Sequence, residues 1–255
     1  MPRFQHERVQ ELAPGTVAVL GVPDDHGSTY MRGPAGAPTA IRAQLHSGSA
    51  NLCTEAGLDL GAQTAFVDLG DLQPGHGEAA RREIERCVSD LLERGCRVLS
   101  IGGDHAVTAP LVAAHAKTHR GIEILHFDAH PDLYDEYDGD RYANACPFAR
   151  IMEAGHARRL VQVGIRTMNP HQRAQAERFG RAACLHLMNE RDADALAALA
   201  ATAEPVVAAR TAPQVDLARD VTLLRSEDFV VRARASERLV AAGASALLTK
   251  PYSLR

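Results

Sequence analysis

The sequence contains no tryptophan, few aromatic residues and only five cysteines. The cysteines are odd in number and scattered, with no C-x-x-C pair, which argues against a disulfide scaffold, a zinc finger or a dithiol redox pair. No run of about 18 apolar residues occurs, and residues 1–12 are polar where a secretory signal would be apolar. We therefore expect a cytoplasmic protein with reduced thiols and no membrane segment.

An excess of charge of one sign is missing as well. The chain carries 28 basic and 32 acidic residues, a formal net charge of -4, and no long block of lysine or arginine. This balance provides no electrostatic footprint for a nucleic acid or an anionic membrane, so neither is an expected partner. With 255 residues and 45% hydrophobic composition, the chain can close a large core without disulfides. A small molecule is the expected ligand.

Short apolar runs alternate with amphipathic stretches between residues 16 and 186, a pattern typical of βα units around a parallel sheet. A helix is expected at about 78–94, where apolar residues recur at helical spacing, and another can begin at Pro38. The expected strands, rich in β-branched and aliphatic residues, are 17–22, 65–69, 97–101, 122–127 and 160–163. The predicted fold class is α/β.

Composition changes after residue 180. Gly243 is the one glycine beyond this point, and alanine becomes frequent. We therefore divide the domain into an α/β core, residues 1–180, and a divergent, alanine-rich tail, residues 181–255, which we expect to be mainly helical. Without further βα units the sheet would be incomplete on its C-terminal side, with an open edge beyond the strand at 160–163.

The clearest chemical motif is His-Phe-Asp-Ala-His-Pro-Asp at 126–132, directly after an expected strand. Side chains two apart on an extended chain point the same way, so Asp128, His130 and Asp132 are expected to converge beyond the strand end. Two carboxylates and an imidazole suit Mn²⁺ or Fe²⁺, and open α/β sheets bind ligands at this edge. The alternative is a polar loop in which the aspartates cap turns.

A second motif, Ser-Ile-Gly-Gly-Asp-His at 100–105, follows the strand at 97–101. Its two glycines permit a tight turn that brings His105 toward a neighbouring strand end as a fourth candidate ligand. Taken alone, the motif can instead be a helix start that Asp104 caps. The two motifs together favour the metal site.

In this order and spacing the motifs resemble those of the ureohydrolase family, the arginases, agmatinases and their relatives. The resemblance covers about residues 15–180 and is strongest for an agmatinase-like protein. Weaker matches occur at Gly21-Val22-Pro23, in the segment 36–42 that ends at Arg42, at Asp68-Leu69-Gly70-Asp71 and at Val163-Gly164-Ile165-Arg166.

The resemblance implies a three-layer α/β/α fold with a mainly parallel sheet. It also implies a manganese site, paired in the family, whose ligands are His105, Asp128, His130 and Asp132, with Asp128 bridging. Asp128 and His130 are the residues expected to take part in catalysis. The implied reaction hydrolyses a small cationic guanidino compound, agmatine-like, to urea and an amine. A homo-oligomer is expected, since the family commonly forms trimers or hexamers.

Two features depart from the family's pattern. No D-x-D motif at a strand end follows residue 180, and Asp192-Ala193-Asp194 is better explained as a helix start, on which side chains two apart diverge. Asn144 stands where the pattern expects a histidine that moves a proton, and an amide cannot titrate. We therefore expect one tightly bound manganese or fewer per chain.

Three functions remain open at the level of sequence. The first is manganese-dependent hydrolysis of an agmatine-like guanidino compound. The second is a catalytically impaired relative that acts as a binding or regulatory protein, and the third is a mononuclear metal amidohydrolase similar to deacetylases. An acidic loop before Asn144 either attracts a guanidinium or is simply solvated; its members are Asp135, Glu136, Asp138 and Asp140.

Overall fold

The computed structural model of the chain describes residues 3–179 and 183–186. Within them, the strands form two three-stranded parallel sheets, in the orders β2-β1-β3 and β4-β5-β6. The strands are β1 (Val17–Val22), β2 (Phe66–Asp71), β3 (Arg97–Gly102), β4 (Glu123–Phe127), β5 (Arg159–Val163) and β6 (Ala183–His186). The predicted α/β class with parallel pairing is confirmed.

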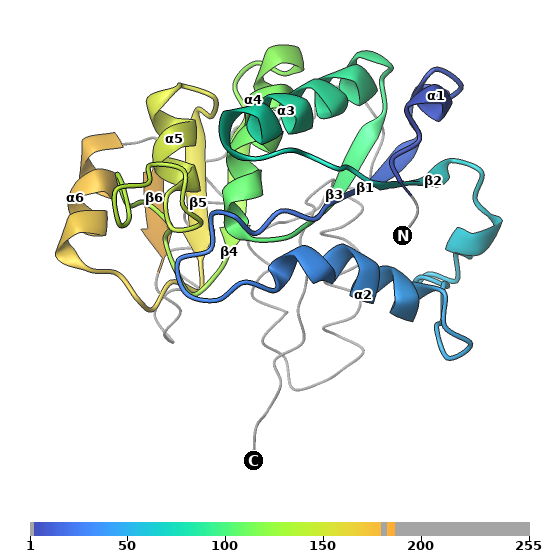
Figure 1. Cartoon of the computed structure of the whole chain (residues 1–255), viewed down its shortest axis with the longest axis horizontal. Coiled ribbons are helices and arrows are strands. Elements are labelled where there is room, and N and C mark those ends of the chain that lie inside the picture. Colours follow the sequence, from blue (N-terminus) through green and yellow to red (C-terminus); the bar gives the residue numbers. More distant parts are fainter. Residues whose placement is uncertain (1–2, 180–182, 187–255) are drawn as a thin grey trace.

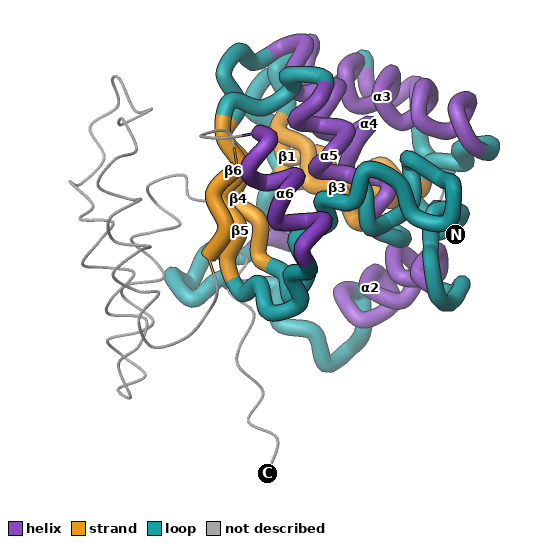
Figure 2. Tube along the Cα trace, turned by 90° about the vertical axis from the view of Figure 1, so that its left-hand side faces the viewer, coloured by secondary structure: helices purple, strands orange, loops and turns teal. Residues whose placement is uncertain are grey.

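Helices flank both sheets. In Figure 1, α3 (Gly77–Glu93) and α4 (Thr108–Thr118) lie above β1–β3, and α2 (Ala37–Leu45) lies on the opposite side, so helices and strands form the expected α/β/α layers. Figure 2 shows α5 (Pro147–Glu153) and α6 (Pro170–Phe179) together on one face of β4–β6. The remaining elements are the short helices α1 (His6–Val9), η1 (Pro34–Gly36), η2 (Leu60–Ala62) and η3 (His105–Val107). No helix among these residues combines the length and hydropathy needed to span a bilayer.

The first core lies between β1 and α3. Strand β1 is buried on both faces, with Leu20 and Val22 fully inaccessible, as expected for a central parallel strand. Helix α3 closes the layer with one apolar face that includes Ile84, Val88 and Leu91. Because burial at helical spacing matches the sequence pattern, both elements form within a residue or two of their predicted bounds.

The second core supports the segment after β4. Leu133 packs with Phe148 and Ile151 of α5 and with Leu160 of β5, all of them fully or almost fully buried. Strand β5 pairs with β4 along its whole length, from Glu123↔Arg159 to Phe127↔Val163. This packing anchors the loop that carries Asp128, His130 and Asp132.

The sheet continues past residue 180. Strand β6 pairs with β5 from Leu160↔Ala183 to Val163↔His186, so the predicted open edge beyond 160–163 is wrong. The reason is that a four-residue strand needs few β-branched residues once a neighbouring strand offers its backbone groups. The rest of the predicted helical tail, including Asp192-Ala193-Asp194, lies outside the described residues.

One buried ion cluster joins two of the weak sequence matches. Arg42 of α2 donates from Nε to Asp68 Oδ2 (2.6 Å) and from Nη2 to Asp68 Oδ1 (3.0 Å), and its Nη1 contacts Asp71. A Cβ at position 21 would lie 1.7 Å from Asp71 Oδ1, so only glycine fits beside this cluster. Burial alone would raise the pKa of Asp68, but the hydrogen bonds from Arg42 and from the Gly70 N–H outweigh burial and lower that pKa. We call Arg42, Asp68 and Asp71 the Arg42 clamp.

Candidate metal centre

The turn after β3 positions His105. The Gly103 N–H donates to Val22 O (2.8 Å), and a Cβ at position 103 would lie 1.9 Å from Asp24 O, so glycine is required for this close approach. Asp104 accepts a hydrogen bond from the Ala106 N–H (2.8 Å) and caps η3. The helix-start interpretation of this motif is therefore confirmed, and the cap is also what orients His105 toward β4.

A turn, rather than continued strand, places the residues of the second motif. Strand β4 ends at Phe127, and the His130 N–H donates to Asp128 Oδ1 (2.8 Å). Asp132 has a φ of 46°, in the left-handed region that is strained for most non-glycine residues. The prediction that alternation along an extended chain makes these side chains converge is therefore wrong, because the chain folds back after Asp128.

The structure places the four predicted ligands as two contacting pairs, His105 with Asp132 and Asp128 with His130, and only His105 and Asp128 fall in one group of possible ligands, together with His126. His105 Nδ1 is 2.5 Å from Asp132 Oδ2, and His130 Nδ1 is 3.2 Å from Asp128 Oδ1. Ligand atoms of His105, His126 and Asp128 all lie within 4.8 Å of one another. His105 and Asp132 are largely buried, whereas the His130 side chain is 61% exposed. The cluster is therefore open to solvent on the side of His130.

The electrostatics keep the central carboxylate ionised. Burial alone would raise the pKa of Asp128, but the nearby His126 ring, with Nε2 3.5 Å from Oδ2, and the hydrogen bond from the His130 N–H outweigh burial and hold that pKa well below its usual range. Burial raises the pKa of Asp104, although the Ala106 N–H and the Ser28 hydroxyl both donate to its carboxylate. The fold therefore stabilises the ionised form of Asp128.

The donor set suits a hard or borderline divalent cation. Two carboxylate–imidazole pairs follow the carboxyl ends of β3 and β4, and ligand atoms of His105 and Asp128 link them at less than 4.8 Å. Oxygen and imidazole donors of this kind fit Mn²⁺ better than a thiophilic ion. The residues present therefore fit the implied metal, with open positions left for water.

A second group of possible ligands in the described part of the chain consists of His6, Glu83 and Cys87. Burial raises the pKa of the Cys87 thiol to about 11, so it stays protonated near neutral pH. Cys87 is also contacted by the Arg86 guanidinium, at 3.4 Å. This group therefore offers a single carboxylate, that of Glu83, beside a protonated thiol.

His126 is a member of the cluster that sequence reasoning did not single out. It lies on β4, is 8% exposed, and its ring stacks on that of His105 with centroids 5.1 Å apart. Phe148 of α5 packs against both rings, at 5.4 Å from His105 and 4.4 Å from His126. The available signal was its position two residues before Asp128, on the same side of the strand.

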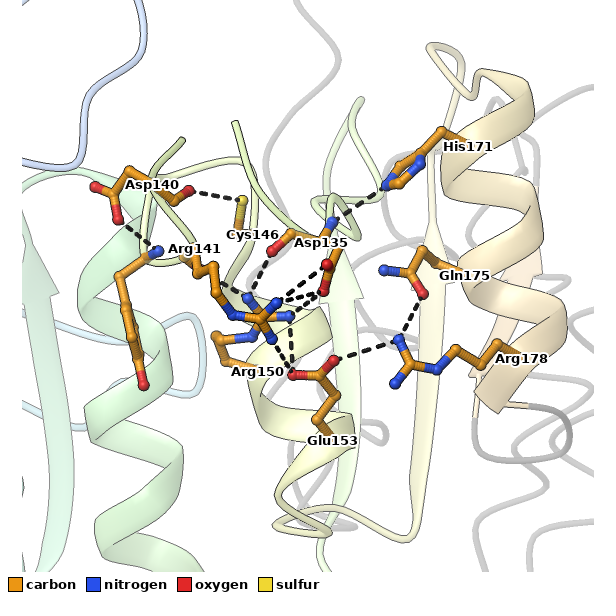
Figure 3. Close-up of polar contacts among 10 residues, drawn as sticks. Asp135, Asp140, Arg141, Cys146, Arg150, Glu153, His171, Gln175 and Arg178 are labelled. Atoms are coloured by element: carbon orange, nitrogen blue, oxygen red, sulfur yellow. Dashed lines mark hydrogen bonds and ion pairs between the residues drawn. The ribbon is translucent and has the colours of Figure 1, made fainter. Parts of the chain in front are cut away.

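Arg141 and Arg150 bind the acidic loop through Asp135 (Figure 3). Buried Arg150 donates to Asp135 Oδ1 (2.8 Å) and to the backbone oxygens of Asp135 and Arg141. Arg141 contacts both Asp135 and Glu153, and Glu153 also pairs with Arg178 of α6. The hydrogen bond from Arg150 lowers the pKa of Asp135. Asp135 is thus engaged within the protein, whereas Glu136, Asp138 and Asp140 are exposed.

Asn144 links this loop to the loop after β1. Its backbone N–H donates to Gly27 O (2.8 Å), and its side-chain oxygen accepts from the Thr29 N–H (3.2 Å). The amide therefore has a structural role in holding two loops together. A proton-transfer role is excluded by its chemistry.

Parallel strands with flanking helices, and a cluster of histidines and aspartates after the carboxyl ends of two strands, define an α/β protein with a candidate metal site. Within that class, this chain belongs to the arginase family: the sequence profile of the family, described as "Arginase family", matches residues 15–221. The match extends past residue 180, in agreement with the strand β6. The predicted resemblance to ureohydrolases is confirmed.

Particular relatives are both arginases and other ureohydrolases. The chain is 44% identical over 180 residues to "Arginase" of Glycine max, which covers 66% of this chain and 51% of that relative. It is 37% identical over 158 residues to "N(1)-aminopropylagmatine ureohydrolase" of Thermus thermophilus, covering 60% and 52%. Among solved structures, an arginase from Medicago truncatula superposes with a TM-score of 0.67 at 36% identity, covering 75% of this chain and 64% of that one. The chain thus spans about half the length of the curated relatives it matches.

Proposed function

We propose that this chain is a manganese-dependent ureohydrolase that converts a small cationic guanidino compound to urea and an amine. The observation that carries the proposal is the contact of His105 with Asp132, 2.5 Å apart, within a cluster that also holds Asp128 at the ends of β3 and β4. The names of the relatives, arginase and aminopropylagmatine ureohydrolase, support the same substrate class.

His105, Asp128, His130 and Asp132 would hold the metal. Bound manganese would supply Lewis-acid activation of water for attack on the guanidinium carbon, which requires no serine or cysteine nucleophile. Asp128 contributes an ionised carboxylate that contacts His130 on one side and lies near His105 on the other. Its proximity to both imidazoles supports its proposed role as a metal ligand.

Arginine and agmatine are the two leading candidate substrates. The motifs suggest an agmatine-like compound, whereas the 44% identity to the soybean arginase favours arginine. Both molecules present the same guanidinium, and they differ in the carboxylate that only arginine carries. Urea release from arginine, agmatine and guanidinobutyrate, measured side by side, decides between them.

The decisive experiment combines metal binding with urea release. We expect Asp128→Asn to abolish tight Mn²⁺ binding in calorimetry and to abolish urea release, because it removes the central charge of the cluster. Asp138→Asn is the matched control, since Asp138 lies in an exposed loop and makes the same change in charge. Equal Mn²⁺ affinity in the wild type and Asp128→Asn would contradict the proposed site.

A catalytically impaired, ligand-binding relative is the second candidate. The observation that favours it is Asn144, whose amide is committed to the Thr29 N–H and has no proton to give at neutral pH. Binding of arginine or agmatine to the manganese-loaded chain without urea release would support this candidate. Release of acetate from acetylated amines would instead indicate the mononuclear amidohydrolase. Cytoplasmic location and homo-oligomer formation stay predictions, for fractionation and light scattering to test.

A further inference from the structure

His126 has two possible roles at this site. It is either a fifth metal ligand or a residue that orients the ligands beside it. Its Nε2 lies 3.5 Å from Asp128 Oδ2, and ligand atoms of His105, His126 and Asp128 are within 4.8 Å of one another. Distance alone allows either role. The hydrogen-bond partners of the ring distinguish them, because a metal-binding nitrogen must present a lone pair.

The orientation of Gln162 is set by Pro131. Gln162 is fully buried on β5, opposite His126, and its Nε2 lies 2.7 Å from the carbonyl oxygen of Pro131. A carbonyl oxygen only accepts, so the atom that faces it must be the amide nitrogen. The opposite orientation would place two acceptor oxygens 2.7 Å apart. Gln162 Oε1 has no partner of its own, which is the cost of this arrangement.

The same amide nitrogen then determines which ring nitrogen of His126 carries the proton. It lies 3.0 Å from His126 Nδ1, and its second hydrogen points there because the first is used by Pro131. Nδ1 must therefore accept and cannot carry hydrogen. The ring proton then lies on Nε2, a buried atom without a hydrogen-bond partner among the described residues, and the Asp128 carboxylate oxygen Oδ2 lies 3.5 Å from it. An Nε2 that carries hydrogen has no lone pair to offer a cation.

We propose that Gln162 locks His126 as the Nε2–H tautomer, so that His126 is a positioning residue for the Asp128 carboxylate and is not a metal ligand. Stacking on His105 and packing of Phe148 hold the plane of the ring, while Gln162 holds its proton. Outer partners of this kind orient a ligating carboxylate and strengthen metal binding. The inference rests on the proposed metal site for its purpose, whereas the tautomer itself does not.

The first test uses the metal-free protein. Long-range ¹H–¹⁵N correlation spectra of the full chain report the tautomer of each histidine, and loss of one signal set in His126→Gln assigns His126. We expect the Nε2–H pattern in the wild type. The Nδ1–H pattern would overturn the proposal whether or not the chain binds manganese or releases urea, so this result is separable from failure of the proposed function.

The second test measures Mn²⁺ affinity by calorimetry. His126→Leu should weaken binding by about 10-fold to 100-fold, whereas His126→Gln, which keeps an N–H donor, should recover most of the affinity. A true ligand would give similar losses in both variants, and that result would overturn the proposal.

A third variant removes the lock alone. Gln162→Leu should release the tautomer of His126 and weaken Mn²⁺ binding, and Gln172→Leu is the matched control, because Gln172 is a glutamine buried in α6. Unchanged tautomer and affinity in Gln162→Leu would contradict the lock. If a variant fails to fold, the wild-type spectrum still decides.

Discussion

Replacement of Arg42 by methionine should destabilise the protein strongly, because it leaves the carboxylates of Asp68 and Asp71 without their cationic partner. The Arg42 side chain is 7% exposed and that of Asp71 2% exposed, so water cannot replace the lost guanidinium at Asp71. Asp68 is more accessible, at 24%, and recovers part of its hydration. Removal of one partner from a buried ion pair costs about 3–5 kcal/mol, and the access of water to Asp68 places the expected loss near the lower end.

The assay is thermal unfolding by calorimetry, with Arg82→Met as the matched control. Arg82 pairs with Glu78 on the surface of α3, where the two side chains are 76% and 66% exposed, so the same substitution should cost about 0.5 kcal/mol or less. For a chain of this size, a loss of about 3 kcal/mol lowers the melting temperature by roughly 6–12 °C. Equal melting temperatures for Arg42→Met and Arg82→Met would refute the reasoning.

The pH dependence of stability provides an independent check of the Arg42 clamp. The pKa of Asp68 is lowered in the fold from its ordinary value of 3.8, so its pairing contributes stability that is fully present above that value and is lost as the pH falls through the folded pKa. The difference in unfolding free energy between the wild type and Arg42→Met should therefore be largest near neutral pH and shrink as the pH falls, because acid first neutralises the buried carboxylates that the variant leaves unpaired and then protonates Asp68 in the wild type. A difference that grows in acid would contradict this account.

Three further predictions concern the candidate metal site and the loop of residues 135–146. Elemental analysis after dialysis should find about one manganese or fewer per chain, and a value of two would mean that residues beyond 186 supply ligands. Asn144→His should raise the rate of urea release by up to about 10²-fold, because an imidazole can protonate the departing amine, and a rate no higher than that of Asn144→Gln would argue against it. Arg150→Met should lower stability by about 2–4 kcal/mol and expose residues 135–146 to limited proteolysis, whereas Arg158→Met, at a 56% exposed side chain, should do neither.

The strands were predictable, and candidate metal ligands could be named, because both kinds of signal are local. Five apolar runs of β-forming residues became β1 to β5, and the helical spacing of Ile84, Val88 and Leu91 became α3. The four candidate ligands follow two of these strands, and the carboxyl ends of parallel strands lie at one edge of a sheet. For these features, residue type and spacing suffice.

Pairings between distant segments were decided by the tertiary structure. Local composition assigned residues 183–186 to a helical tail, yet they form β6 because β5 offers an unpaired edge. The sequence allowed Asp135 to be a solvated loop residue. In the structure it accepts a hydrogen bond from Arg150, which is 15 residues away in the chain. Periodicity carries no information on such partners, since they depend on which surfaces meet after the strands assemble.

The candidate site shows the same division. The sequence determined by itself which residues can ligate a metal and near which strand ends they stand, because ligand chemistry belongs to the side chain and strand order to the chain. Only the tertiary structure decided that His126 joins them and that Gln162 faces it across the β4–β5 pair. Residues 36 positions apart became hydrogen-bond partners through the register of two strands, and no local pattern encodes that register.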